Sequence, residues 1–150
     1  MKRVLAAVDG SNYGWKALDL AITYAEALDS ELLVVHVIPG DEIPEHLVEF
    51  AGAHDIGAEE TEYAWRKTTM LDEKIVAEAK RLLSDRHVKT SKVLVRKGDP
   101  AEHIVYEAHQ NHVQMIFIGH RGLSTAEHML MGNVAQKVAN LARCTCVIVK

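Results

Sequence analysis

The chain has 150 residues, of which 48% are hydrophobic and 25% charged, and its formal net charge is −4 at pH 7. This size and composition are typical of one compact globular unit, so we expect residues 1–150 to form a single domain. The acidic balance disfavours a nucleic-acid partner, which would require a basic surface. No apolar run approaches the roughly 20 residues that span a bilayer, so we expect a cytoplasmic protein without a membrane partner.

Short apolar runs recur along the chain and predict five β-strands. Four of them are nearly continuous and rich in Val and Ile, which is typical of strands covered on both faces. A further run alternates between apolar and polar residues, which favours an edge strand with one partly solvated face. The runs are residues 4–8, 32–38, 92–96 (the alternating one), 115–118 and 146–149.

Between these runs the apolar residues return at steps of three and four, which predicts helices. The stripes lie within residues 15–25, 71–82, 101–108 and 134–141. Ser11 or Asn12 can cap the first helix, and Asp99 followed by Pro100 is a typical helix start. Alternating strands and helices predict an α/β fold: one doubly wound open sheet of five parallel strands with helices on both faces.

The segment of residues 39–66 fits neither pattern and is longer than an ordinary connection. We treat it as an irregular insert with a short amphipathic helical stretch. Its acidic residues are irregularly spaced, which favours a solvated surface over a metal or acid–base cluster.

The two cysteines, Cys144 and Cys146, lie two residues apart at the last predicted strand. Alternate residues of a strand share one face, so both thiols would point the same way. Two adjacent thiols cannot complete a four-ligand metal site. We therefore interpret them as small buried apolar residues and predict no metal centre.

Open α/β sheets bind ligands beyond the carboxyl ends of their strands, so the chemistry is expected there. Asp9 follows the first strand and a Gly-His-Arg-Gly sequence, Gly119 to Gly122, follows the fourth. Gly132 and Asn133 come nine residues later, at the start of the last helix. Glycines let the backbone approach an anion, and the first amides of a helix point outward, so this loop resembles a phosphate cradle.

Other side chains near this loop could add to anion binding. Arg121 or His120 would bring positive charge, and the Asn133 amide could donate a hydrogen bond. The P-loop lysine and the dinucleotide glycine fingerprint are both missing from the sequence.

Several motifs together resemble the universal stress protein family. The loop matches the pattern G-x-x-G, nine residues, then G followed by a small polar residue, here Gly132 and Asn133. Val-Asp-Gly-Ser at residues 8–11, Val-His-Val-Ile at 35–38 and Gly-Asp-Pro at 98–100 extend the likeness over nearly the whole chain.

The resemblance implies a strand order of 3-2-1-4-5 and binding of ATP or a related adenine nucleotide, AMP or ADP, with or without Mg²⁺. It also implies a homodimer built on the final strand, which would run from Thr145 to Lys150. A hydroxyl residue is usual where this chain has Asn133, and an amide does not ligate Mg²⁺ as a hydroxyl would. The nucleotide-binding residues that the resemblance implies are Ala7, Val8, Asp9, Val37, Gly119, Arg121, Gly122, Ser124, Gly132, Asn133 and Val134.

Each candidate also has a purely structural interpretation. Asp9 could cap the following helix instead of holding a ribose. The apolar strand around His36 favours its interpretation as a hydrogen-bonded core histidine over that of a catalytic base. His120 is expected to be better exposed, but the sequence pairs it with no nucleophile. We therefore predict a regulatory nucleotide-binding protein with no catalytic residues; the alternatives are an interaction module with a vestigial pocket and a slow phosphohydrolase.

Overall fold

The computed structural model describes residues 2–38, 40, 43, 45–69, 71–122 and 131–150, and for residues 45–47 and 66–69 it describes the backbone alone. The strands form one sheet of five parallel strands in the order β3-β2-β1-β4-β5. The predicted fold class and strand order are confirmed. In chain order the elements are β1 (Arg3–Ala7), α1 (Asn12–Ala27), β2 (Glu31–Ile38), α2 (Glu45–Ala53), α3 (Ala58–Thr69), α4 (Asp72–Ser84), β3 (Ser91–Lys97), α5 (Pro100–Gln110), β4 (Met115–Gly119), α6 (Asn133–Leu141) and β5 (Thr145–Val149).

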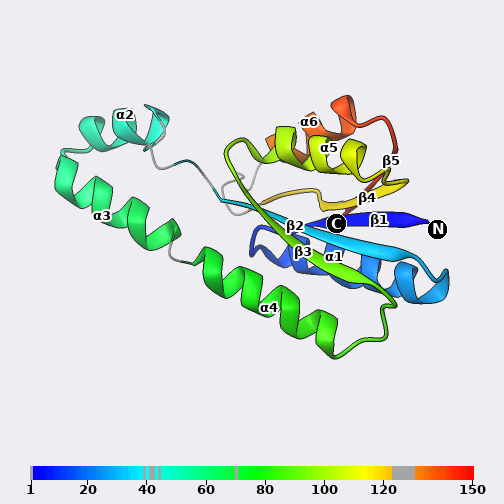
Figure 1. Cartoon of the computed structure of the whole chain (residues 1–150). Coiled ribbons are helices and arrows are strands. Elements are labelled where there is room, and N and C mark those ends of the chain that lie inside the picture. Colours follow the sequence, from blue (N-terminus) through cyan, green and yellow to red (C-terminus); the bar gives the residue numbers. More distant parts are fainter. Residues whose placement is uncertain (1, 39, 41–42, 44, 70, 123–130) are drawn as a thin grey trace.

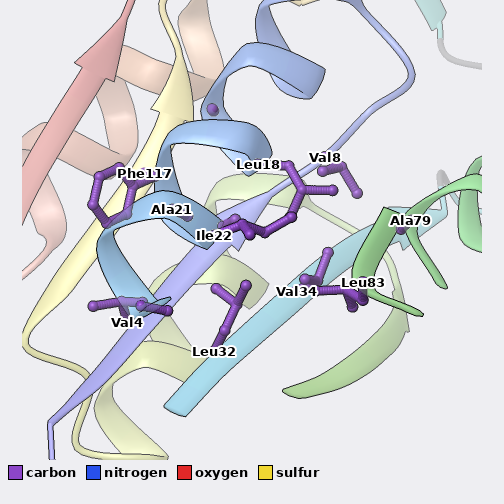
Figure 2. Close-up of a cluster of buried hydrophobic side chains, with 13 residues drawn as sticks. Val4, Val8, Leu18, Ala21, Ile22, Leu32, Val34, Ala79, Leu83 and Phe117 are labelled. Carbon is purple, nitrogen blue, oxygen red and sulfur yellow. The ribbon is translucent and has the colours of Figure 1, made fainter. Parts of the chain in front are cut away.

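Helices cover both faces of the sheet, with α1 and α4 on one side and α5 and α6 on the other (Figure 1). The core on the first side is built from β1, β2 and β4 against α1 and α4 (Figure 2). Leu18 and Ile22 of α1 are fully or almost fully buried there. Burying each such side chain stabilises the fold by about 1.5–3 kcal/mol. The alternation of strand side chains places a second core beneath α5 and α6.

The insert at residues 39–66 contains two helices, α2 and the greater part of α3. In Figure 1 they extend away from the sheet, and the chain returns to the sheet through α4. Large apolar side chains on these helices, Val48, Phe50 and Tyr63, are exposed. The expected helical stretch is therefore present, but these exposed apolar side chains do not belong to the cores on the two faces of the sheet.

Two predicted helix starts are confirmed. The Ser11 hydroxyl accepts a hydrogen bond from the Gly14 N–H at 3.1 Å and is the N-cap of α1. Asp99 accepts from the Glu102 N–H at 2.9 Å and is the N-cap of α5, with Pro100 next in the chain. Such caps satisfy amides that the first helical turn leaves without intrahelical partners.

The alternating strand, β3, lies at one edge of the sheet as expected, and β5 lies at the other. The first strand is displaced by one residue from the prediction, because β1 begins at Arg3 and ends at Ala7, and Val8 lies beyond it. Within the described part of the chain, no helix has both the length and the apolar character needed to cross a membrane.

Candidate functional site

The carboxyl ends of β1 and β4 place the predicted site residues side by side. These strands are neighbours in the sheet, with Val4 opposite Met115 and Ala6 opposite Phe117. Asp9 follows the end of β1, and Gly119 ends β4. The sheet topology therefore brings together two segments that are more than a hundred residues apart in the chain.

The Asp9 carboxylate is half-buried and supports the start of α1. Its Oδ1 accepts hydrogen bonds from the Ser11 N–H at 2.9 Å and from the Ser11 hydroxyl at 2.5 Å. Asp9 is thus not the N-cap itself, since Ser11 has that place, but it fixes the capping residue. Gly10 between them has a φ of 88°, a conformation that glycine adopts without strain.

Glycines at the end of β4 permit two close approaches. A β-carbon on Gly122 would stand 2.5 Å from Asp9 Oδ2, and one on Gly119 would stand 2.7 Å from Tyr13 Cβ. No side chain fits at either position without displacing its neighbour. The glycine loop therefore packs directly against the segment that contains Asp9 and the first turn of α1.

The two ends of the loop after β4 meet. The Gly132 N–H donates a hydrogen bond to the His120 carbonyl at 2.6 Å, which closes the loop just before α6 begins. Gly132 is the N-cap of α6 and supplies no side-chain cap. Asn133 and Val134, the next residues, are exposed. The first amides of α6 consequently lie near Gly119 and Gly122 with no side-chain cap of their own, while Ser124 falls outside the described residues.

On the other side of β1, Val37 directs its backbone toward the same region. The Val35 carbonyl accepts from the Val8 N–H at 3.0 Å, so the backbone groups of Val35 face β1. Alternate residues of a strand direct their backbone groups to the same side, and Val37 therefore faces β1 too. Because β1 ends at Ala7, the Val37 N–H and carbonyl point beyond that strand.

The Arg121 side chain lies on Tyr13. Its Nη2 donates a hydrogen bond to the Tyr13 hydroxyl at 3.0 Å, and its guanidinium carbon is 5.3 Å from the centroid of that ring. Lys16 Nζ is also 5.3 Å from the same centroid. Two cationic side chains therefore lie against the same aromatic ring, and the ring stabilises positive charge next to Gly122.

The expectation of an exposed His120 is wrong, because the side chain is buried. Its ring packs against the Tyr13 ring at a centroid distance of 4.4 Å, and its Nδ1 lies 3.3 Å from the Val149 carbonyl. Tyr13 reaches this position because Gly119 has no side chain to obstruct it. His120 is therefore a packing residue in this structure.

His36, by contrast, is a buried and hydrogen-bonded histidine, as predicted. Sequence reasoning missed its partner Asp72, the first residue of α4, whose carboxylate lies 2.5 Å from the ring. It also missed Gly14, where a β-carbon would lie 2.9 Å from Asp9 Oδ1. A glycine inside the helical stripe of α1 was the available signal for the latter.

The described residues contain no cluster of His, Cys, Asp and Glu that could hold a metal ion. Burial raises the pKa of both cysteine thiols, which are free and half-buried. A raised pKa keeps these sulfurs protonated and makes them poor ligands and poor nucleophiles near neutral pH.

A family model described as the universal stress protein family matches residues 1–150. Relatives with similar sequences include universal stress protein YxiE of Bacillus subtilis, which is 29% identical over 161 residues and covers 99% of this chain and 98% of its own. A universal stress protein of Thermus aquaticus is 31% identical over 149 residues, with 99% and 98% covered.

Solved structures share the fold. Universal stress protein UspA from Lactobacillus plantarum superimposes with a TM-score of 0.73 at 17% identity, covering 99% of this chain and 97% of its own. A universal stress protein in complex with cAMP has a TM-score of 0.68 at 20% identity, with 99% and 96% covered. One from Archaeoglobus fulgidus in complex with dAMP has a TM-score of 0.65 at 19% identity, with 100% and 98% covered.

Proposed function

Because the chain belongs to the universal stress protein family, we propose that it binds an adenine nucleotide, ATP or a relative such as AMP or ADP, at the carboxyl edge of its sheet. Two similar structures contain cAMP and dAMP. The observation that carries the proposal is the closure between Gly132 and His120, which brings an N-terminus without a side-chain cap next to the glycine loop. Backbone amides at such a helix start favour negative charge.

Each part of a nucleotide has a matching group in this proposal. The amides of Asn133 and Val134 would donate to phosphate, and the backbone of Gly119, Gly122 and Gly132, without side chains, would let the phosphate approach closely. Asp9 would accept hydrogen bonds from the ribose hydroxyls, as carboxylates do. The Val37 backbone, with Ala7 and Val8 beside it, would meet the base. Arg121 would contribute charge by exchanging its bond with the Tyr13 hydroxyl for one with phosphate.

Titration of nucleotide-free protein tests the proposal directly. The protein is unfolded, freed of small molecules and refolded, and calorimetry then follows additions of AMP, ADP, ATP and, as the matched control for the base, GTP. We expect adenine nucleotides to bind and GTP to bind more weakly. Ligand at 100 times its Kd should add about 2.7 kcal/mol of stability, visible as a rise in Tm. No heat and no rise in Tm at millimolar adenine nucleotide would refute it.

Asn133 allows a separate test of metal dependence. Its amide donates a hydrogen bond but is a poor substitute for a hydroxyl ligand of Mg²⁺. We expect Mg²⁺ to change the affinity for ATP little in the natural chain and more in Asn133→Ser. The affinity for AMP, which carries one phosphate, should be similar in both proteins.

We propose further that the nucleotide is a regulatory ligand with little or no hydrolysis. His120, the base considered for hydrolysis, is buried against Tyr13. Phosphate release by homogeneous protein should therefore stay at background, and His120→Ala should not change it. Release that persists through purification and is lost in His120→Ala would favour the slow phosphohydrolase instead.

A second candidate function, an interaction module with a vestigial pocket, is favoured by the exposed Val48, Phe50 and Tyr63 on α2 and α3. Nucleotide binding separates the two candidates. A bulky substitution, Gly122→Leu, should abolish binding in the first case and have no functional effect in the second. A single domain over residues 1–150 and a cytoplasmic location stay predictions.

A further inference from the structure

A buried hydrogen-bonded pair, His36 and Asp72, links three elements next to the proposed site. His36 of β2 is 3% exposed and Asp72 of α4 is 7% exposed. The ring Nδ1 lies 2.9 Å from the Val8 carbonyl, just after β1, and Nε2 lies 2.5 Å from Asp72 Oδ1. Val8 immediately precedes Asp9 in the chain.

The hydrogen-bond chemistry fixes which nitrogen of the ring carries a proton. A backbone carbonyl only accepts, so Nδ1 must carry a hydrogen and donate it to Val8. Nε2 and Asp72 Oδ1 then share one proton, as imidazolium with carboxylate or as imidazole with carboxylic acid. Asp72 therefore holds the ring with Nδ1 toward Val8 in either state.

This bond replaces one that a regular sheet would make. In a regular parallel sheet, a residue makes two backbone hydrogen bonds to the neighbouring strand. If its N–H donates to the carbonyl of residue n in that strand, its carbonyl accepts from the N–H of residue n + 2. Since Val8 donates to Val35, its carbonyl would be the regular acceptor for the Val37 N–H. Among the described residues it is the His36 ring, and not the Val37 N–H, that donates to this carbonyl.

Stability alone is a weak explanation for the pair. Asp72 Oδ2 is buried and makes no hydrogen bond among the described residues. Removing such a group from water costs free energy, and the attraction between the paired groups roughly offsets that cost. A well-packed apolar pair would hold α4 against β2 at least as well.

We propose that His36 and Asp72 are positioning residues for the nucleotide site. By occupying the Val8 carbonyl, the ring leaves the Val37 N–H directed beyond β1, where the base would lie, and it fixes the backbone that leads into Asp9. Helix α4, through its first residue, thus supports a site that it does not touch. This inference rests on the nucleotide site proposed above.

Substitutions separate the link from general stability. His36→Phe keeps the ring volume but removes both hydrogen bonds, and Asp72→Ala removes the group that orients the ring. Asp72→Asn is the conservative rescue, because its amide can donate to Nε2 of a neutral imidazole. Glu107→Ala is the matched control, since Glu107 is a similarly buried carboxylate, 5% exposed, that pairs with Arg96 on the opposite face of the sheet.

We expect His36→Phe and Asp72→Ala to weaken AMP binding by about tenfold, as the loss of a buried hydrogen-bond partner does. Asp72→Asn and Glu107→Ala should bind AMP like the natural chain. Folded His36→Phe and Asp72→Ala with natural affinity would overturn the inference while leaving the proposed function in place. Failure of the natural chain to bind AMP would overturn both.

A spectroscopic measurement on the natural chain covers the case in which these variants do not fold. In protein labelled with ¹⁵N-histidine, the His36 Nδ1 proton should be protected and should shift when AMP is added, because its acceptor adjoins the site. The ring of His109, exposed on α5, is the internal control and should not shift. A His36 signal that is unchanged at saturating AMP would contradict the positioning role.

Discussion

The Asp9 carboxylate lies against the backbone of Gly122, so close that a β-carbon at residue 122 would stand 2.5 Å from Asp9 Oδ2. Gly122→Ala should therefore displace either the loop or the carboxylate. We expect it to destabilise the protein by about 1–3 kcal/mol, as overpacking does. Nucleotide affinity should fall by roughly a hundredfold, since small displacements of positioning groups are that costly.

A double-mutant cycle assigns this effect to the Asp9 contact. In the Asp9→Ala background the clash is gone, and adding Gly122→Ala should then change the free energy of unfolding little. Gly52→Ala is the control, because a β-carbon at residue 52 meets nothing within 4 Å. If Gly122→Ala lowered the free energy of unfolding equally in the natural and the Asp9→Ala backgrounds, the contact with Asp9 would not be the cause of the destabilisation.

A substitution at Gly119 should not be relieved by truncating its neighbour, as one at Gly122 is, because the contact of Gly119 is with the backbone and Cβ of Tyr13. A β-carbon there would lie 2.8 Å from the Tyr13 carbonyl carbon as well as 2.7 Å from Tyr13 Cβ. Gly119→Ala should destabilise the protein by about 1–3 kcal/mol or more. Tyr13→Ala keeps both contacted atoms and should not relieve the loss. Denaturant titration measures this, and full relief by Tyr13→Ala would contradict the packing described for β4 and α1.

The sequence predicts local features better than these contacts. Residues 32–38 form an apolar run interrupted only by His36, which indicates a strand covered on both faces, and Asp99 with Pro100 indicates a helix start; the structure confirms both. The contact between Gly122 and Asp9 depends on β1 and β4 being neighbours, which apolar periodicity does not specify. The family resemblance supplied that strand order.

Residues whose role depends on distant partners were harder to predict. The loop position of His120 suggests exposure, but Tyr13 from the neighbouring α1 covers it. Asp72 looks like an ordinary acidic residue in the first turn of a helix, and only the packing of α4 against β2 reveals its bond to His36. Local patterns do not encode contacts of this kind.

Two helix caps offer a matched pair for the candidate site. Ser11 caps α1 and also donates two hydrogen bonds to Asp9, whereas Asp99 caps α5. Ser11→Ala and Asp99→Ala should each lower stability by about 1 kcal/mol. Only Ser11→Ala should also lower nucleotide affinity, because it removes the hydroxyl that donates to the Asp9 carboxylate and leaves only the residue 11 N–H of the two hydrogen bonds from this residue. Equal affinities in the two variants, measured by calorimetry, would remove Asp9 orientation from the proposal.

The proposed homodimer can be tested at the free edge of β5. Thr145 donates to Gln114 and Val149 accepts from His120, so residues 145, 147 and 149 direct their backbone groups to β4. Cys146 and Ile148 then direct theirs to the open edge. Cys146→Pro removes an outward N–H and should shift the protein to monomers, as light scattering would show.

Val147→Pro is the comparison for the edge, because it removes an N–H that faces β4. It should lower the free energy of unfolding of the subunit itself, whereas Cys146→Pro should weaken only the dimer. A natural chain that is monomeric at all concentrations, or a Cys146→Pro variant that dimerises as tightly as the natural chain, would refute the β5 interface.

The link between α1 and the end of α4 should give the protein part of its acid sensitivity. A hydrogen bond from Arg86, which follows α4, and one from the His87 N–H lower the pKa of Glu26 below its usual 4.5. A lowered pKa in the folded state means that the unfolded chain binds more protons there, so stability falls as pH falls from 4.5 through the folded pKa.

Glu26→Gln should lower Tm at pH 7 and reduce the slope of Tm against pH below 4.5. Lys89→Met, which removes the neighbouring exposed contact with Asp29, is the control and should change that slope less. A Glu26→Gln profile parallel to that of the natural chain would show that this carboxylate contributes nothing to acid unfolding.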